Sequence, residues 1–335
     1  EGGGLWNSSS GTMTVENVVF NGNAANGSGA DNGGGGLFND GGTCSVADST
    51  FRLNRADQGS GSGGAIFNVG GDFSASWCRV LDNWSNRAGG GIEIVAGSTE
   101  LFNCEFSRNA TGAVPGNGGA LHVTGAAEVF VELCDVRDNT AAAEGGGLWN
   151  SSSGQLTVSN CEIEANSAAG DAADQGGGGL FNDGGTLRVF GGQLHANRAT
   201  GASGSGGGVL NDLGTLELTS VTVTANTAVR AGGGVEANVG TTTLLRTRLD
   251  GNSTGSNPGN GGGLHLTGPG TVGVERCAVT RNFAANEGGG LWNSSSGLMT
   301  VTLSRITDNE SPDGPNLFND RGNLVVDGTP IPPAN

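Results

Sequence analysis

Two glutamate–histidine pairs are the residues of this chain whose types and spacing could support acid–base chemistry. Glu93 precedes His122, and Glu236 precedes His265, and every member stands between two small or apolar residues, as in Ile92–Ile94. A carboxylate beside an imidazole can carry protons to and from a substrate. The alternative interpretation of each pair is a charge-assisted contact between adjacent strands.

The two pairs are copies of each other, because the chain repeats itself at an interval of 143 residues. Glu1–Gly11 returns at Glu144–Gly154 and again at Glu287–Gly297. The sequence therefore predicts tandem super-repeats over 1–143, 144–286 and a partial 287–335, with a Pro-rich tail from about 329. A duplicated pair suits a repeated packing or binding surface better than a single catalytic pocket.

A shorter motif recurs every 26 to 32 residues and defines the elements that must position these side chains. It reads Gly-Gly, an aliphatic residue, a variable residue and often Asn, then a turn and an alternating run such as Thr215–Thr219. Alternation of apolar and polar residues predicts strands with one face inward. The favoured fold is all-β: one right-handed parallel β-helix (solenoid) over 1–335, with about 12 coils of three short strands each.

The motifs of the repeat resemble those of a known family. Gly-Gly-Ala-Ile at Gly63–Ile66, with Phe-x-x-Asn at Phe20–Asn23, Phe51–Asn54 and Phe106–Asn109, resembles the paired motifs of bacterial polymorphic outer-membrane proteins. It is also similar to the wider class of parallel β-helix repeats in bacterial surface proteins. The resemblance covers essentially the whole chain and implies an architecture, because β-helices serve as adhesins, enzymes and stalks alike.

Equivalent residues of successive coils become neighbours in a solenoid, so each repeated position forms a column. One column is the Asn of apolar-x-x-Asn, whose stacked amides can hydrogen-bond along the stack as a ladder. This predicts a structural ladder of Asn23, Asn54, Asn83, Asn109, Asn139, Asn166, Asn197, Asn226, Asn252, Asn282 and Asn309. A second column places Cys78, Cys104, Cys134 and Cys161 in consecutive coils, with Cys277 later; we expect these and Cys44 to be buried free thiols.

The third column holds the glutamate–histidine pairs. Strand parity predicts that it points outward, and its members are Trp6, Phe38, Phe67, Glu93, His122, Trp149, Phe181, Leu210, Glu236, His265, Trp292 and Phe318. Three interpretations are open. Gly-rich loops or a neighbouring chain cover the column; or Trp6, Phe38, Phe67, Trp149, Phe181, Trp292 and Phe318 form an exposed platform for glycans or proteins; or the pairs perform acid–base catalysis.

The case for an enzyme is weak in the sequence. At ~4.8 Å per coil, Glu93 and Glu236 would lie ~24 Å apart. A glycosidase needs two carboxyls about 5 to 10 Å apart. The chain has no Lys, and the column supplies no cationic base of the kind that polysaccharide lyases use. We therefore expect no cofactor, apart from weakly bound Ca²⁺ at the Asn-Asp-Gly-Gly turns of Asp40 and Asp183.

The charge of the chain limits its partners. A net charge of −17 argues against nucleic acid, whose phosphates need a basic surface, and no apolar run is long enough for a membrane span. The sequence favours a noncatalytic extracellular or cell-surface β-helix with a structural or adhesive role, either part of a larger surface protein or a head-to-tail filament. The alternative is a polysaccharide-binding or polysaccharide-degrading β-helix. Expected partners are further copies, joined head to tail or through the aromatic column, and glycans or host or cell-surface proteins.

Overall fold

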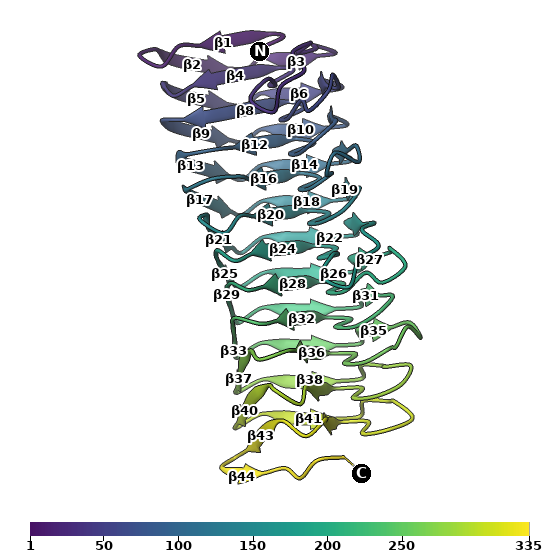
Figure 1. Cartoon of the computed structure of the whole chain (residues 1–335). Coiled ribbons are helices and arrows are strands. Elements are labelled where there is room, and N and C mark those ends of the chain that lie inside the picture. The colour runs from purple at the N-terminus through teal and green to yellow at the C-terminus, as the bar shows by residue number, and fades with distance from the viewer. Residues whose placement is uncertain (335) are drawn as a thin grey trace. The chain divides into compact units, whose positions relative to one another are not determined.

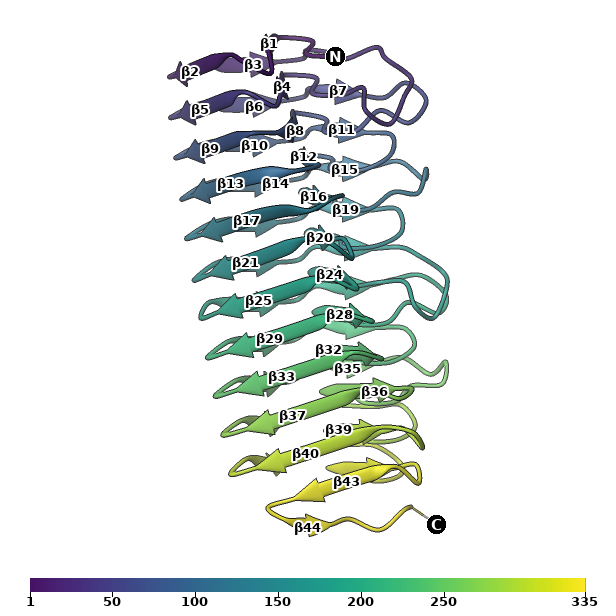
Figure 2. The same cartoon turned by 60° about the vertical axis from the view of Figure 1, so that its left-hand side comes forward.

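The computed structural model describes residues 1–334 as coils of short parallel strands (Figures 1 and 2). They divide into an N-terminal unit, Glu1–Asn166, and a C-terminal unit that begins at Ser167. Within each unit, the strands of one coil pair with the equivalent strands of the next, so each unit contains four sheets, numbered here in the order in which a coil visits them.

The strands of the N-terminal unit fall into these four sheets. The first contains β1 (Leu5–Asn7), β4 (Leu37–Asp40), β8 (Ile66–Gly70), β12 (Ile92–Ile94), β16 (Leu121–Val123) and β20 (Leu148–Asn150). The second contains β2 (Thr12–Glu16), β5 (Thr43–Ala47), β9 (Asp72–Ser76), β13 (Gly97–Phe102), β17 (Ala127–Glu132) and β21 (Gln155–Ser159). The third contains β3 (Val19–Asn21), β6 (Thr50–Arg52), β10 (Arg79–Leu81), β14 (Glu105–Ser107), β18 (Asp135–Arg137) and β22 (Glu162–Glu164). The fourth contains β7 (Arg55–Ala56), β11 (Trp84–Ser85), β15 (Ala110–Thr111) and β19 (Thr140–Ala141).

The C-terminal unit repeats the arrangement. Its first sheet contains β24 (Leu180–Asp183), β28 (Val209–Asp212), β32 (Val235–Asn238), β36 (Leu264–Thr267), β39 (Leu291–Asn293) and β42 (Leu317–Asn319). The second contains β25 (Thr186–Phe190), β29 (Thr215–Thr219), β33 (Thr241–Leu245), β37 (Thr271–Glu275), β40 (Leu298–Thr302), β43 (Asn323–Val326) and β44 (Thr329–Pro330). The third contains β26 (Gln193–His195), β30 (Thr222–Thr224), β34 (Arg248–Asp250), β38 (Ala278–Thr280) and β41 (Arg305–Thr307). The fourth contains β23 (Ser167–Ala168), β27 (Arg198–Ala199), β31 (Thr227–Ala228) and β35 (Ser253–Thr254).

The predicted all-β solenoid is confirmed. Residues 1–334 contain twelve first-sheet strands, six in each unit, and the last coil is incomplete because it lacks a third-sheet strand. The three predicted strands are present in the first eleven coils, and eight of these coils add a fourth strand of two residues. In the described part of the chain, no helix is long and apolar enough to cross a membrane.

Tight corners connect the strands and require unusual backbone conformations. The residue two positions before each third-sheet strand and the residue before each ladder Asn adopt positive φ, as at Trp77 (φ 55°) and Leu53 (φ 56°). A side chain in this left-handed region costs roughly 1–2 kcal/mol, so the corners persist because the stacked hydrogen bonds around them outweigh that cost. The core lies between the sheets, where Phe20 and Phe51 stack with ring centroids 4.3 Å apart.

The C-terminal tail folds over the last coil. β44 pairs antiparallel with β43, and the N–H of Ile331 donates to the carbonyl of Leu324 at 2.8 Å. Asn319 Nδ2 donates to the carbonyl of Ile331, and the N–H of Ala334 donates to the carbonyl of Asn319, both at 2.9 Å. The tail thus occupies strand edges of the first and second sheets that an added coil would use.

Candidate functional site

The column at the centre of the first-sheet strands is buried, and the prediction of an exposed aromatic platform is wrong. Trp6 in the first coil is 48 % exposed, but Trp149 is only 7 % exposed and Phe67 1 %. The buried members are Phe38, Phe67, Glu93, His122, Trp149, Phe181, Leu210, Glu236, His265, Trp292 and Phe318. These positions offer no surface for a glycan, a partner protein or a second copy.

The Gly-Gly turn that precedes each first-sheet strand and the column residues of the adjacent coils together cover these side chains. The turn alone does not, because Trp6 follows the same turn at Gly2 and is exposed. In each coil a glycine with positive φ lies directly over the residue four positions later. A Cβ built on Gly118 (φ 66°) would lie 2.7 Å from the Cβ of His122, and one on Gly261 (φ 63°) would lie 2.5 Å from the Cβ of His265. The flanking apolar residues are buried as well, so both faces of these strands are covered. Of the three interpretations, coverage by Gly-rich segments is the one that fits.

In the N-terminal unit, strand register brings the first acid–base pair into contact. β12 and β16 place Glu93 opposite His122, and His122 Nδ1 lies 2.9 Å from Glu93 Oε2. Thr124 Oγ1 donates to Glu93 Oε1 and lies 3.0 Å from His122 Nδ1, and Arg87 Nη1 lies 3.5 Å from Glu93 Oε1. On its other side His122 stacks on Trp149, with ring centroids 4.2 Å apart.

The C-terminal unit contains the same cluster. His265 Nδ1 lies 3.0 and 3.1 Å from the two carboxylate oxygens of Glu236. Thr267 Oγ1 donates to Glu236 Oε1 at 2.6 Å, and Arg230 Nη1 lies 3.6 Å from the same oxygen. His265 stacks on Trp292 at 4.2 Å between centroids. Every group in the cluster is therefore held by another group of the scaffold.

The electrostatics of Glu236 show how this cluster is stabilised. Burial acts to raise the pKa of its carboxyl, but the charge and hydrogen bond of His265, the Arg230 guanidinium and the Thr267 hydroxyl outweigh burial, so the pKa lies below its usual value. Glu236 is 1 % exposed and His265 3 %. A general acid or base must come within hydrogen-bond reach of its substrate, and groups this deeply covered cannot. Their burial and their contacts fit a structural role for the clusters in the scaffold.

The Asn ladder is confirmed in both units. Asn139 is representative: its Oδ1 accepts from the backbone N–H and the Nδ2 of Asn109 at 2.9 and 3.0 Å. Its Nδ2 donates to the carbonyl of Phe106 at 3.0 Å and to Asn166 Oδ1 at 2.9 Å. One buried amide thus makes four hydrogen bonds. It lies next to the corner at Asp138, the preceding residue, which adopts positive φ.

The six cysteines are free and buried, as predicted. In the stack, each thiol donates to a carbonyl and accepts a backbone N–H from the previous coil; the N–H of Cys104, for example, lies 3.3 Å from Cys134 Sγ. Burial raises the pKa of Cys44 to about 11. Within residues 1–334, no group of three or more His, Cys, Asp or Glu side chains is placed to hold a metal ion.

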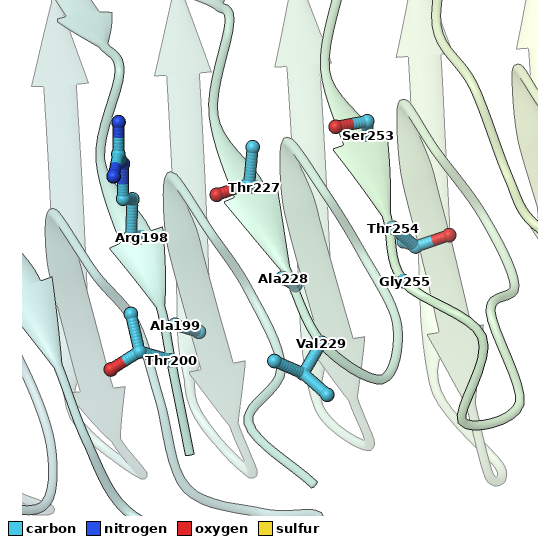
Figure 3. Close-up of a pocket in the computed structure, with 9 residues that line it drawn as sticks. All are labelled: Arg198, Ala199, Thr200, Thr227, Ala228, Val229, Ser253, Thr254 and Gly255. Carbon is cyan, nitrogen blue, oxygen red and sulfur yellow. The ribbon is translucent and has the colours of Figure 1, made fainter. Parts of the chain in front are cut away.

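A groove in the C-terminal unit was not predicted from the sequence. It has a volume of about 540 Å³ and runs across β27, β31 and β35 (Figure 3). Its lining comprises Arg198, Ala199, Thr200, Thr227, Ala228, Val229, Ser253, Thr254 and Gly255. Hydroxyl and alkyl groups dominate it, and the lining contains no carboxylate, imidazole or thiol. Such a groove can contact a ligand, but it holds no acid–base pair.

A second exposed feature lies on the second sheet of the N-terminal unit, and we call it the aromatic face. It consists of Trp77, which is 58 % exposed, Phe102 at 37 % and Phe130 at 39 %, together with the carboxylates of Glu100 and Glu132. These residues were missed because they lie outside the repeated motifs. The signal that could have found them is the lack of duplication of the three rings and of Glu100: 143 residues later the sequence has Ser220, Leu245, Gly273 and Thr243, and only Glu132 is retained, as Glu275.

Stacked parallel strands, a ladder of Asn amides and a duplicated buried cluster define a parallel β-helix. The sequence matches the family described as right-handed β-helix region over residues 39–235, and the chain belongs to this family. No curated protein and no solved structure matches the chain. The family therefore establishes the architecture and leaves the role of the surface to be inferred.

Proposed function

We propose that this protein is a noncatalytic structural or adhesive β-helix that presents its outer faces to other molecules. The observation that carries the proposal is the burial of both glutamate–histidine pairs, each tied to a threonine, an arginine and a stacked tryptophan. In both copies, the residues best suited to acid–base chemistry are thereby part of the buried scaffold. What remains on the surface is suited to contact.

The proposed setting is extracellular or at the cell surface. Two observations support it: the motifs resemble those of bacterial polymorphic outer-membrane proteins, and the Lys-free composition is rich in Gly, Asn, Ser and Thr. The structure contains no disulfide among its six cysteines, so stability there would depend on stacking and hydrogen bonding. Glycans or cell-surface proteins are the partners that this setting supplies.

The second candidate function is binding or degradation of a polysaccharide, favoured by the exposed rings of the aromatic face. A glycan array followed by turnover assays separates the two roles. We expect no release of reducing or unsaturated ends from any glycan that the chain binds. Release by the native chain that is lost in the double variant Glu93→Gln, Glu236→Gln would overturn the noncatalytic proposal, provided that the variant keeps its cooperative unfolding.

A further inference from the structure

The aromatic face stands out because its rings and carboxylates alternate on two neighbouring strands. β13 and β17 pair in register, with Glu100 opposite Phe130 and Phe102 opposite Glu132. Each ring therefore has a carboxylate beside it on the next strand. The two rings lie on a diagonal, with Cα atoms about 8 Å apart for a strand spacing of ~4.8 Å and a rise of ~3.3 Å per residue. Together with Leu101 these four residues line an open groove of about 360 Å³.

Trp77 extends this surface at the adjoining corner. Its ring lies 6.2 Å from that of Phe102 between centroids, at an angle of 76°. A protein surface that gathers several exposed rings commonly marks a site of interaction. These rings lie side by side on an open sheet face and do not enclose a cage around one small cation. An open row of rings suits an extended chain of flat units.

The charges of the face restrict which chain it can take. In the described structure no side chain hydrogen-bonds or pairs with the carboxylates of Glu100 and Glu132, whereas Glu105, on the neighbouring sheet, pairs with Arg79 and Arg137. The strands β5, β9, β13, β17 and β21 contain no basic residue. The N-terminal unit as a whole carries 18 carboxylates and six Arg. An acidic polysaccharide would be repelled, and a cationic one attracted.

We infer that the aromatic face binds a polysaccharide whose sugars carry free amino groups. The rings pack against the apolar faces of the sugars, while Glu100 and Glu132 pair with the ammonium groups and accept from hydroxyls. The inference rests on the proposed adhesive function and names its ligand class. It involves no bond cleavage.

The probe is a glucosamine oligosaccharide, titrated calorimetrically into the whole chain at low salt. We expect one site per chain, an affinity that falls as salt rises, and a loss of binding when the sugars are N-acetylated. Phe102→Ala and Phe130→Ala should each weaken binding about three- to tenfold, and Glu100→Gln with Glu132→Gln should abolish most of the salt dependence.

The chain offers matched controls. Trp77→Asn removes a ring without straining the corner, because Asn17, Asn103 and Asn160 adopt the same positive φ in equivalent corners; it should weaken binding while keeping stability. Leu245→Ala, at the position equivalent to Phe102, should leave affinity unchanged. A Cβ on Gly273 meets no atom within 4 Å, and Glu275 pairs with Arg276, where the N-terminal unit has Leu133. The variant Thr243→Glu, Leu245→Phe, Gly273→Phe, Arg276→Leu should therefore raise the stoichiometry from one to two.

Several outcomes would overturn the inference. Equal binding of the acetylated oligosaccharide would show that charge does not select the ligand. Full competition by polylysine at the same residues would point to a basic polypeptide partner. Absence of binding, or binding unaffected by Phe102→Ala and Phe130→Ala, would remove the site itself. None of these results touches the noncatalytic proposal, which fails only if the chain cleaves a glycan.

Discussion

His265 Nδ1 lies 3.0 and 3.1 Å from the two carboxylate oxygens of Glu236, and both side chains are buried. Removing one partner of a buried ion pair leaves the other charge uncompensated, which typically costs 3–5 kcal/mol. We therefore expect Glu236→Gln to lower the free energy of unfolding by about 3 kcal/mol at neutral pH, as measured by urea denaturation. The control is Glu217→Gln: Glu217 pairs with Arg188 at the surface, 3.2 Å away, and its loss should cost less than about 1 kcal/mol.

The same pair predicts a pH dependence. The pKa of Glu236 is lowered in the folded chain, so its ionised form stabilises the fold above the pKa of an unfolded Glu, roughly 4.3. This contribution is lost as the pH falls through the lower, folded pKa. The stability difference between the native chain and Glu236→Gln should be full at pH 7 and shrink at acidic pH below roughly 4. A difference that stays constant down to pH 3 would contradict the assignment of the ionised form.

The Asn ladder predicts a large cost for losing a single amide. Asn139→Ala removes the four hydrogen bonds made by that side chain and leaves the N–H of Asn109 and the carbonyl of Phe106 without their partner. At about 1 kcal/mol for each bond, unfolding in urea should show a loss of about 3–5 kcal/mol. Asn160→Gly is the control, because Asn160 is exposed at a corner with φ 51° that glycine adopts readily. Equal losses in the two variants would argue against the ladder.

The thiols predict a reactivity pattern. All six cysteines are buried, so a reagent in solvent cannot reach the thiols. Burial raises the pKa of Cys44 to about 11 and also raises that of Cys277, whereas hydrogen bonds within the stack lower the pKa of Cys104 and Cys161, so protection there depends on burial alone. A thiol reagent at pH 8 should label none of them in the folded chain and all six after unfolding. Reducing agents should leave the melting temperature unchanged. Rapid labelling of Cys104 or Cys134 in the native chain would show that the stack opens.

The tail predicts an effect on self-association. Truncation after Gly328 removes β44 and the contacts of Ile331 and Ala334, and so exposes the edges of β42 and β43. We expect the truncated chain to form larger assemblies in sedimentation velocity, because open edges pair with other strands. The full chain at the same concentration is the control. If both sediment as the same discrete species, head-to-tail stacking through this end is excluded.

The sequence predicted the fold well because the repeat places the same residue types at the same point of every coil. The ladder from Asn23 to Asn309 and the buried thiols could be inferred from their columns alone. The burial of Trp149 could not be inferred, because parity tells which side of a strand a residue faces and not whether another segment covers that side. The covering turn depends on Gly145 adopting positive φ (64°) close to Trp149, which local spacing does not reveal.

The aromatic face escaped prediction for the opposite reason. Trp77, Phe102 and Phe130 break the repeat, so a search for recurring positions passes over them. Inside the scaffold, departures from the repeat are penalised by the neighbours above and below; on the outer face they cost little. In a duplicated chain of this kind, residues that differ between copies on the surface are the better guide to recognition.

The ladder also limits how the chain can change in length. Each ladder Asn presents the same donor and acceptor to the next coil. A gain or loss of one complete coil therefore leaves every amide with an Asn neighbour, whereas insertion of part of a coil would misalign all the columns. Coils of 26 to 32 residues coexist here because the loops outside the paired strands take up the difference. Insertion or deletion of a complete coil is therefore the change in length that this fold tolerates best, because it leaves the contacts of the interior unchanged.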